Sequence, residues 1–271
     1  MQSSRRANLA RRRSTQAQNS HSLMVSMGSG PKYPNQQLRS VSLETYFPGE
    51  LGSFSRFGAV QEALRESLPN LFVPNLQPGE PVALRPFQLR DVEQTKSLAL
   101  AVNQATYVSF RYPGYDSFAA EAVTMVAGAL AHLNPTKLNR VVYRYENELG
   151  IAREAKGELG IERIFPGAIS NVFVQGDMAG PAKALDAAVE HAWQADGFEG
   201  ARGFHARTEN VGSSLVFKLT VFGAVEGCAV ADLDRATATA HRVGLNLFEA
   251  LISPAFREFI SANQGESADA G

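Results

Sequence analysis

The spacing of apolar and polar residues predicts an alternating series of strands and helices from residue 38 to residue 149. Residues 54–68 place apolar side chains every three or four positions, which indicates an amphipathic helix with Ser53 as its N-cap. A second helix is expected with Asp116 as its N-cap, and Asn134-Pro135 ends it. The expected elements are a strand at 38–47, a helix at 53–68, three strands at 86–95, 97–103 and 105–112, a helix at 116–133 and a strand at 138–149.

This order of elements is close to a split βαβ, ferredoxin-like layer in which helices cover one face of a sheet. The strand at 138–149 then has two different sides because successive side chains alternate. Val141, Tyr143 and Tyr145 should face the helices. Arg140 and Arg144, with Glu146 and Glu148, should lie on the uncovered face.

Beyond residue 150, the sequence predicts a smaller α+β half. Leu185, Val189 and Trp193 recur at a spacing of four and predict a helix over 181–197. Residues 200–209 and 213–223 predict an antiparallel strand pair, and a long helix is expected over 231–252 with a last turn after Pro254. The expected organisation is a disordered basic leader at 1–30, the ferredoxin-like layer at 31–150, the second half at 151–262 and a disordered tail at 263–271.

Charge is distributed unevenly along the 271 residues. Residues 1–43 contain seven Lys and Arg and no Asp or Glu. Removing these seven from the 26 basic residues leaves 19 against 27 acidic residues, a net charge of about −8 beyond the leader. This acidic body argues against a dedicated DNA-binding surface. The leader itself fits three readings: a disordered extension with Met24 or Met27 as the natural start, an organelle transit peptide, or a basic arm for nucleic acid or membrane surfaces.

Cysteine content and hydropathy narrow the cellular setting. Cys228 is the only cysteine, so an internal disulfide is excluded and a reducing compartment, the cytoplasm, is expected. No apolar run approaches the roughly 20 residues that a membrane helix requires, so we expect no membrane span.

The sequence contains none of the common catalytic or metal-binding motifs, and we expect no cofactor and no metal. His191 and His241 lie beside apolar stripes of expected helices, where a histidine without ligand-binding function is the ordinary case. His205 and Arg207 share one face of a strand and are candidates for a polar ligand site. Asp232 and Asp234 open the last long helix, where capping accounts for them better than metal binding does.

The segment LNRVVYRYENEL carries a pattern of Arg140, Arg144, Tyr145 and Asn147. This Arg-x-x-x-Arg-Tyr-x-Asn pattern resembles the most recurrent motif of a sporadically distributed bacterial family of uncharacterised proteins of similar length. KYPNQQLRSVSLETYF, YVSFRYPGYDSF and HRVGLNLFEALISPAFREFI are also similar to segments of that family, so the resemblance covers most of residues 31–262. Glu146 stands where the family usually has an apolar residue. The resemblance implies a fold and a bacterial origin, which weakens the transit-peptide reading, but it carries no activity.

Three hypotheses about function follow from these features. The first is a non-catalytic protein-interaction or assembly module that self-associates or binds a protein partner. The second is an enzyme or binder of a small acidic ligand that uses Arg140, Arg144, His205 and Arg207 in a cleft between the halves. The third is RNA recognition by tyrosines on the sheet, which the expected burial of Tyr143 and Tyr145 disfavours. We also expect Arg144 to be paired with an acidic residue and to be structural before it is functional.

Overall fold

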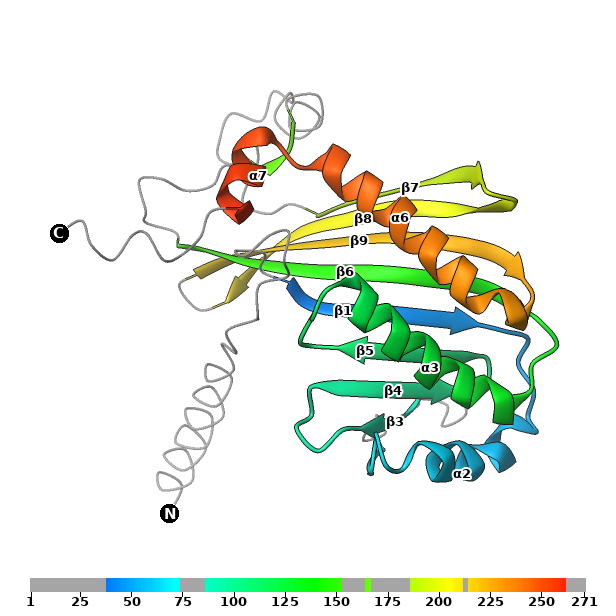
Figure 1. The fold of residues 1–271 in the computed structure, drawn as a ribbon. Coiled ribbons are helices and arrows are strands. Elements are labelled where there is room, and N and C mark those ends of the chain that lie inside the picture. Colours follow the sequence, from blue (N-terminus) through cyan, green and yellow to red (C-terminus); the bar gives the residue numbers. More distant parts are fainter. Residues whose placement is uncertain (1–37, 74–85, 153–163, 167–185, 212–213, 262–271) are drawn as a thin grey trace, which may run out of the picture.

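The computed structural model describes residues 38–73, 86–152, 164–166, 186–211 and 214–261. These residues form an α+β fold in which helices cover one face of a large antiparallel sheet (Figure 1). Helices α3 and α6 lie across the middle of that face, with α2 beside α3 and α7 at the end of α6. The leader expected at 1–30 and the tail expected at 263–271 lie outside the described residues.

The described sheet has nine strands in the order β2-β3-β4-β5-β1-β6-β9-β8-β7, and each neighbouring pair is antiparallel. The strands are β1 Leu38–Tyr46, β2 Asn70–Phe72, β3 Phe87–Arg90, β4 Lys96–Ala101, β5 Gln104–Ser109, β6 Leu138–Ala152, β7 Asp186–Ala195, β8 Phe198–Val211 and β9 Ser214–Cys228. The helices are α2 Ser53–Leu64, α3 Tyr115–Leu133, η2 Val230–Asp232, α6 Leu233–Leu251 and α7 Pro254–Ser261. None of the described helices is both long and apolar enough to cross a membrane.

The sheet is larger than the ferredoxin-like layer expected from the sequence. Strand β6 pairs with β1 on one side and with β9 on the other, so the strands before and after residue 150 belong to one sheet. The pairing with β9 runs from Leu138 to Ala152 and passes through the position where we placed a domain boundary. The boundary itself stays a prediction.

The first half follows the predicted series of elements with one addition, the short strand β2, which falls where the sequence predicted only a connection. Strand β6 has the expected faces: Tyr143 and Tyr145 are buried on the helix side, and Arg144 lies on the other side. The strand predicted at 86–95 is shorter than expected and ends at Arg90. The reason is a turn built by Asp91, whose carboxylate accepts hydrogen bonds from the Thr95 hydroxyl at 2.7 Å and the Lys96 amide at 2.9 Å.

The predicted helix caps are wrong in two places. Gly52 is the N-cap of α2 and Gly114 is the N-cap of α3, and neither helix has a side-chain cap. Gly114 has a φ of 106°, which an L-residue rarely adopts, so the glycine is required where β5 turns into α3. Asp116 lies in the first turn of α3, where its charge still suits the helix dipole.

The predicted helix over 181–197 is wrong, because residues 186–195 form the edge strand β7. Val189 and Trp193 are four residues apart, and this spacing places two side chains on one face of a strand as well as of a helix. Asp196 and Gly197 have φ values of 54° and 76° and form the two-residue turn of a hairpin with β8. His191 therefore lies exposed on a strand rather than on a helix.

The core lies between the sheet and the helices in two clusters that α6 connects. The first half of α6 packs with α3 and β6, and the second half packs with α7 and the far ends of β8 and β9. Helix α6 touches β9 closely where Gly223 faces Gly244, and a Cβ at Gly223 would lie 2.1 Å from the Ala240 carbonyl oxygen. The last helix begins as predicted after Ser253, whose hydroxyl accepts a hydrogen bond from the Phe256 amide at 3.0 Å.

Candidate functional site

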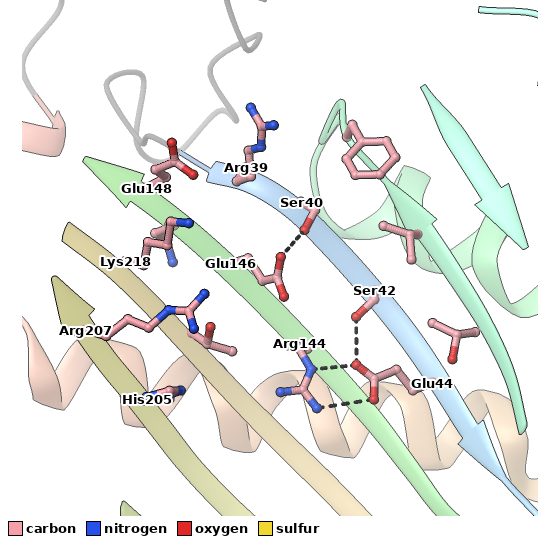
Figure 2. A pocket seen from close by; sticks show the side chains of 15 residues that line it. Arg39, Ser40, Ser42, Glu44, Arg144, Glu146, Glu148, His205, Arg207 and Lys218 are labelled. Carbon is pink, nitrogen blue, oxygen red and sulfur yellow. Dashed lines mark hydrogen bonds and ion pairs between the residues drawn. The ribbon is translucent and has the colours of Figure 1, made fainter. Parts of the chain in front are cut away.

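The candidate site lies on the sheet face opposite the helices, which we call the open face. A depression of about 610 Å³ crosses this face from β5 to β8. Its charged lining comes from four strands, β1, β6, β8 and β9. Figure 2 shows these side chains projecting from one side of the sheet. These residues are Arg39, Glu44, Arg144, Glu146, Glu148, His205, Arg207 and Lys218.

Arg144 forms the most buried ion pair of the open face with Glu44, which lies on the neighbouring strand β1. The guanidinium group donates through Nε to Glu44 Oε1 at 2.5 Å and through Nη2 to Oε2 at 3.2 Å (Figure 2). The Glu44 side chain is 9% exposed and the Arg144 side chain is 29% exposed. This bidentate ion pair fits the shape of a guanidinium group to that of a carboxylate, and it is stronger than a pair with a single hydrogen bond. The predicted acidic partner of Arg144 is therefore on its own layer.

The surroundings of Glu44 favour its charged form. Burial alone would raise the pKa of this carboxyl, but hydrogen bonds and charge from Arg144 outweigh burial and lower the pKa. The hydroxyls of Ser42 and Tyr46 also donate to Glu44, at 3.1 Å and 2.9 Å. Burial and the neighbouring Glu44 charge raise the pKa of Tyr46 to about 12, so Tyr46 stays a donor at neutral pH.

Arg140 lies further along β6 and connects it to the strands on the other side. Its Nη2 is 3.3 Å from Glu190 Oε1 on β7, and its Nε is 3.1 Å from Glu226 Oε1 on β9. The guanidinium carbons of Arg140 and Arg144 lie 5.8 Å and 5.4 Å from the ring centre of Phe222. Both arginines of the motif thus contact the same aromatic ring, within the range of cation–π attraction.

Tyr145 does not join the arginines, because its side chain lies on the helix-covered side of β6, whereas Asn147 is among the residues that line the depression. The Tyr145 hydroxyl is 2.6 Å from His241 Nδ1 on α6. Asn147 donates through Nδ2 to the Leu219 carbonyl on β9 at 3.2 Å and is buried. Tyr145 therefore contacts a helix rather than the open face, and Asn147 connects β6 to β9 at the edge of the depression.

His241 belongs to a buried aromatic cluster between β6, α3 and α6. Its ring stacks on Tyr115 with 3.7 Å between ring centres, and Tyr143 lies at 5.1 Å. Burial lowers the pKa of His241 to about 4, so the ring is neutral at pH 7. The sequence placed His241 beside an apolar stripe, but no sequence signal connected it to Tyr145.

His205 and Arg207 lie on the open face of β8, as predicted, and line the same depression as Arg144. His205 Nε2 is 2.6 Å from Asp186 Oδ1 on β7. Arg207 Nη2 is 3.0 Å from Glu209 Oε1, and Lys218 Nζ is 2.7 Å from Glu209 Oε2. The structure therefore brings the predicted candidates of both halves to one surface, but each of these basic side chains already has a carboxylate neighbour.

Sequence reasoning missed the carboxylates that pair with the candidate cations. Glu44, Glu190 and Glu226 lie on three strands far apart in the sequence, so only the strand order brings them near Arg140 and Arg144. Phe222 was missed as well, because its contact with two arginines depends on the pairing of β6 with β9. The described residues contain no group of three or more His, Cys, Asp or Glu that could hold a metal ion.

No protein-family model and no curated protein matches the sequence. The resemblance carried by Arg140, Arg144, Tyr145 and Asn147 therefore stays a prediction. Among the described residues, the site has the chemistry of a paired, nearly self-neutralised polar surface.

Proposed function

We propose that this protein is a non-catalytic protein-interaction or assembly module of a bacterial cytoplasmic system. The observation that carries the proposal is the mutual pairing of charges on the open face, in which Arg140, Arg144, His205, Arg207 and Lys218 each contact a carboxylate. A catalytic centre or an anion site usually keeps some charged groups available for the substrate. The cytoplasmic setting rests on the single Cys228, which is buried and free.

A broad sheet face of mixed charge suits a protein partner better than a polyanion. Non-obligate protein interfaces combine polar and apolar area in about the proportions of an ordinary surface. The open face has this mixed character, since Val108, Phe110 and Thr220 line the depression beside the paired charges. A nucleic-acid surface instead needs an excess of unpaired Lys and Arg.

Solution size and partner capture test the proposal directly. The full chain is analysed by size-exclusion chromatography with light scattering over a range of concentrations, and by affinity capture followed by cross-linking mass spectrometry. Thr220→Arg introduces a long charged side chain into the depression without removing an ion pair. Thr124→Arg makes the same change on the exposed side of α3 and is the matched control.

We expect the parent chain to self-associate or to capture a defined protein, and Thr220→Arg to weaken that association while Thr124→Arg retains it. A parent chain that stays monomeric at all concentrations and captures no partner would refute the proposed function. Equal behaviour of the two variants would remove the open face as the binding surface.

Binding of a small acidic ligand is the second candidate function. The observation in its favour is that Arg144, His205, Arg207 and Lys218 converge on one depression. A ligand would have to replace Glu209 as the partner of Arg207 and Lys218, or Asp186 as the partner of His205. A thermal-shift screen with nucleotides and organic acids tests this candidate, and any stabilisation should disappear in Arg207→Ala. The third candidate, RNA recognition by the sheet, has less support because Tyr107, Tyr143 and Tyr145 are buried on the helix side.

The finer description of the fold is also an inference of ours. The strand order β4-β5-β1-β6, with α2 after β1 and α3 between β5 and β6, supports a ferredoxin-like split βαβ unit embedded in the larger sheet. The second half would then extend this unit with β9, β8, β7 and α6.

A further inference from the structure

Strand β7 is an edge strand with an exposed outer side. It is the last strand in the sheet order, and β8 is its only described neighbour. Eight of its ten residues are exposed and two are half-buried. Val189 keeps 49% of its surface accessible, so an apolar side chain of this strand is available to a partner. An edge strand that is long, exposed and partly apolar is a template for pairing with another strand.

The hairpin turn determines which backbone groups of β7 are available. Because the loop at Asp196 and Gly197 has two residues, Ala195 and Phe198 form a hydrogen-bonded pair next to it. Hydrogen-bonded positions alternate along an antiparallel pair. The amide and carbonyl groups that point away from β8 therefore belong to Ala188, Glu190, Ala192 and Gln194.

We propose that β7 pairs with β7 of a second copy of this chain, antiparallel and centred on His191. The inference deepens the assembly function proposed above and rests on it. In this register the outward groups of Glu190 meet those of the partner's Ala192, and those of Ala188 meet the partner's Gln194. The same register places Val189 directly opposite the partner's Trp193 on the helix side of the sheet. An aromatic and a β-branched residue form a favourable cross-strand pair.

Other symmetric registers place fewer of these side chains in favourable cross-strand pairs. A centre at Glu190 places two carboxylates directly opposite each other, which is destabilising. A centre at Val189 leaves Trp193 beyond the paired segment, and a centre at Ala192 sets Val189 opposite an alanine. With His191 at the centre, Glu190 lies opposite an alanine of the partner, and each His191 Nε2 accepts a hydrogen bond from Arg202 of its own chain.

Sedimentation velocity of the full chain tests the pairing. A paired edge is smaller than a standard protein interface, so we expect a reversible dimer with a dissociation constant of about 1–100 µM. Ala192→Pro removes an outward amide that pairing requires and leaves the hydrogen bonds to β8 in place. Two backbone hydrogen bonds per dimer are then lost, which should weaken the dimer roughly 100-fold. Ala192→Thr keeps the amide and is the matched control that should still dimerise.

Cysteine cross-linking tests the register. Two His191→Cys residues would face each other across the symmetry axis as a non-hydrogen-bonded pair with Cα atoms about 4.5 Å apart, within the range for a disulfide. Val189→Cys is the matched control, because its two copies would lie four residues apart along the strands, about 13 Å. We expect an oxidised dimer for His191→Cys and none for Val189→Cys or the parent chain, whose Cys228 is buried.

The outcomes separate this inference from the proposed function. If the parent chain associates but Ala192→Pro associates equally well, the edge pairing is wrong while an assembly function still holds. If the parent chain is monomeric and Ala192→Pro loses a captured protein, the edge binds a different partner and the second copy is wrong. Cross-linking of Val189→Cys instead of His191→Cys would overturn the register. A monomer that captures nothing overturns both proposals.

Discussion

Replacing Arg144 with methionine should destabilise the fold because it leaves a buried charge without its main partner. Glu44 would keep its burial and the hydroxyls of Ser42 and Tyr46, but would lose two hydrogen bonds and the opposite charge. Breaking a buried ion pair costs about 3–5 kcal/mol. We expect the lower end, about 3 kcal/mol, because 29% of the Arg144 side chain reaches solvent. For a chain of this size the loss corresponds to a decrease in Tm of about 6–12 °C.

The reverse change, Glu44→Gln, should cost less, roughly 1 kcal/mol, because the partly exposed guanidinium group of Arg144 can turn to water. The double variant should then be more stable than the sum of the two single effects predicts. Arg65→Met is the matched control, since Arg65 and Glu62 form an exposed pair on α2 that should contribute less than about 1 kcal/mol.

Acidification provides an independent check on this reasoning. In the parent chain the lowered pKa of Glu44 stabilises the fold at pH values above the usual pKa range of a carboxyl group. This stabilisation is lost as the pH falls through the pKa of Glu44 in the folded state. Without Arg144, burial should raise the pKa of Glu44 instead, so protonation relieves the cost. The deficit of Arg144→Met should therefore shrink between pH 7 and pH 5, as measured by urea denaturation. A decrease in Tm no larger than that of Arg65→Met, or a deficit independent of pH, would refute the reasoning.

Two further predictions concern α6. Gly223→Ala should destabilise the fold by more than about 3 kcal/mol in urea denaturation, because the new Cβ would overlap the Ala240 carbonyl and force α6 away from β9. Gly58→Ala is the control: its new Cβ contacts nothing within 4 Å, so this variant should be neutral or slightly stabilising. His241→Phe should remove a pH dependence of the stability. Burial lowers the pKa of His241 in the folded chain from 6.5 to about 4, so the parent chain should lose up to about 3 kcal/mol of folding stability as the pH falls from about 6.5 to about 4. Profiles of Tm against pH that coincide for the parent and the variant would contradict this.

Most elements of the first half could be predicted because local patterns determine them. The strand at β6 alternates strictly enough that the burial of Tyr143 and the exposure of the Arg144 face both follow from a period of two. The helix caps were less predictable. Gly52 and Gly114 are the N-cap residues of α2 and α3, whereas the sequence suggested Ser53 and Asp116. Capping preferences are weak compared with the geometry that a tight strand-to-helix connection imposes.

The second half was harder to predict because its signals are compatible with two structures. A spacing of four residues between Val189 and Trp193 fits both a helix and a strand, and alanine in this segment favours the helix interpretation. The stronger signal was Asp196-Gly197, a dipeptide that occurs in two-residue hairpin turns and that accounts for the whole β7–β8 pair. Recognising that turn would have placed His191 on a strand from the sequence alone.

The contacts of the Arg-x-x-x-Arg-Tyr-x-Asn pattern give it a structural explanation that needs no catalytic activity. Arg140 reaches β7 and β9, and Arg144 reaches β1. Tyr145 contacts α6, and Asn147 contacts β9. Four side chains of one strand thus connect β6 to its two neighbouring strands, to the edge strand and to the long helix. Losing Arg144 would leave the buried Glu44 carboxylate without its main partner, and losing Arg140 would remove the contacts of β6 with Glu190 and Glu226. In this chain the pattern is therefore accounted for by the contacts that hold β6 in the sheet, whatever protein or ligand the open face and the β7 edge bind.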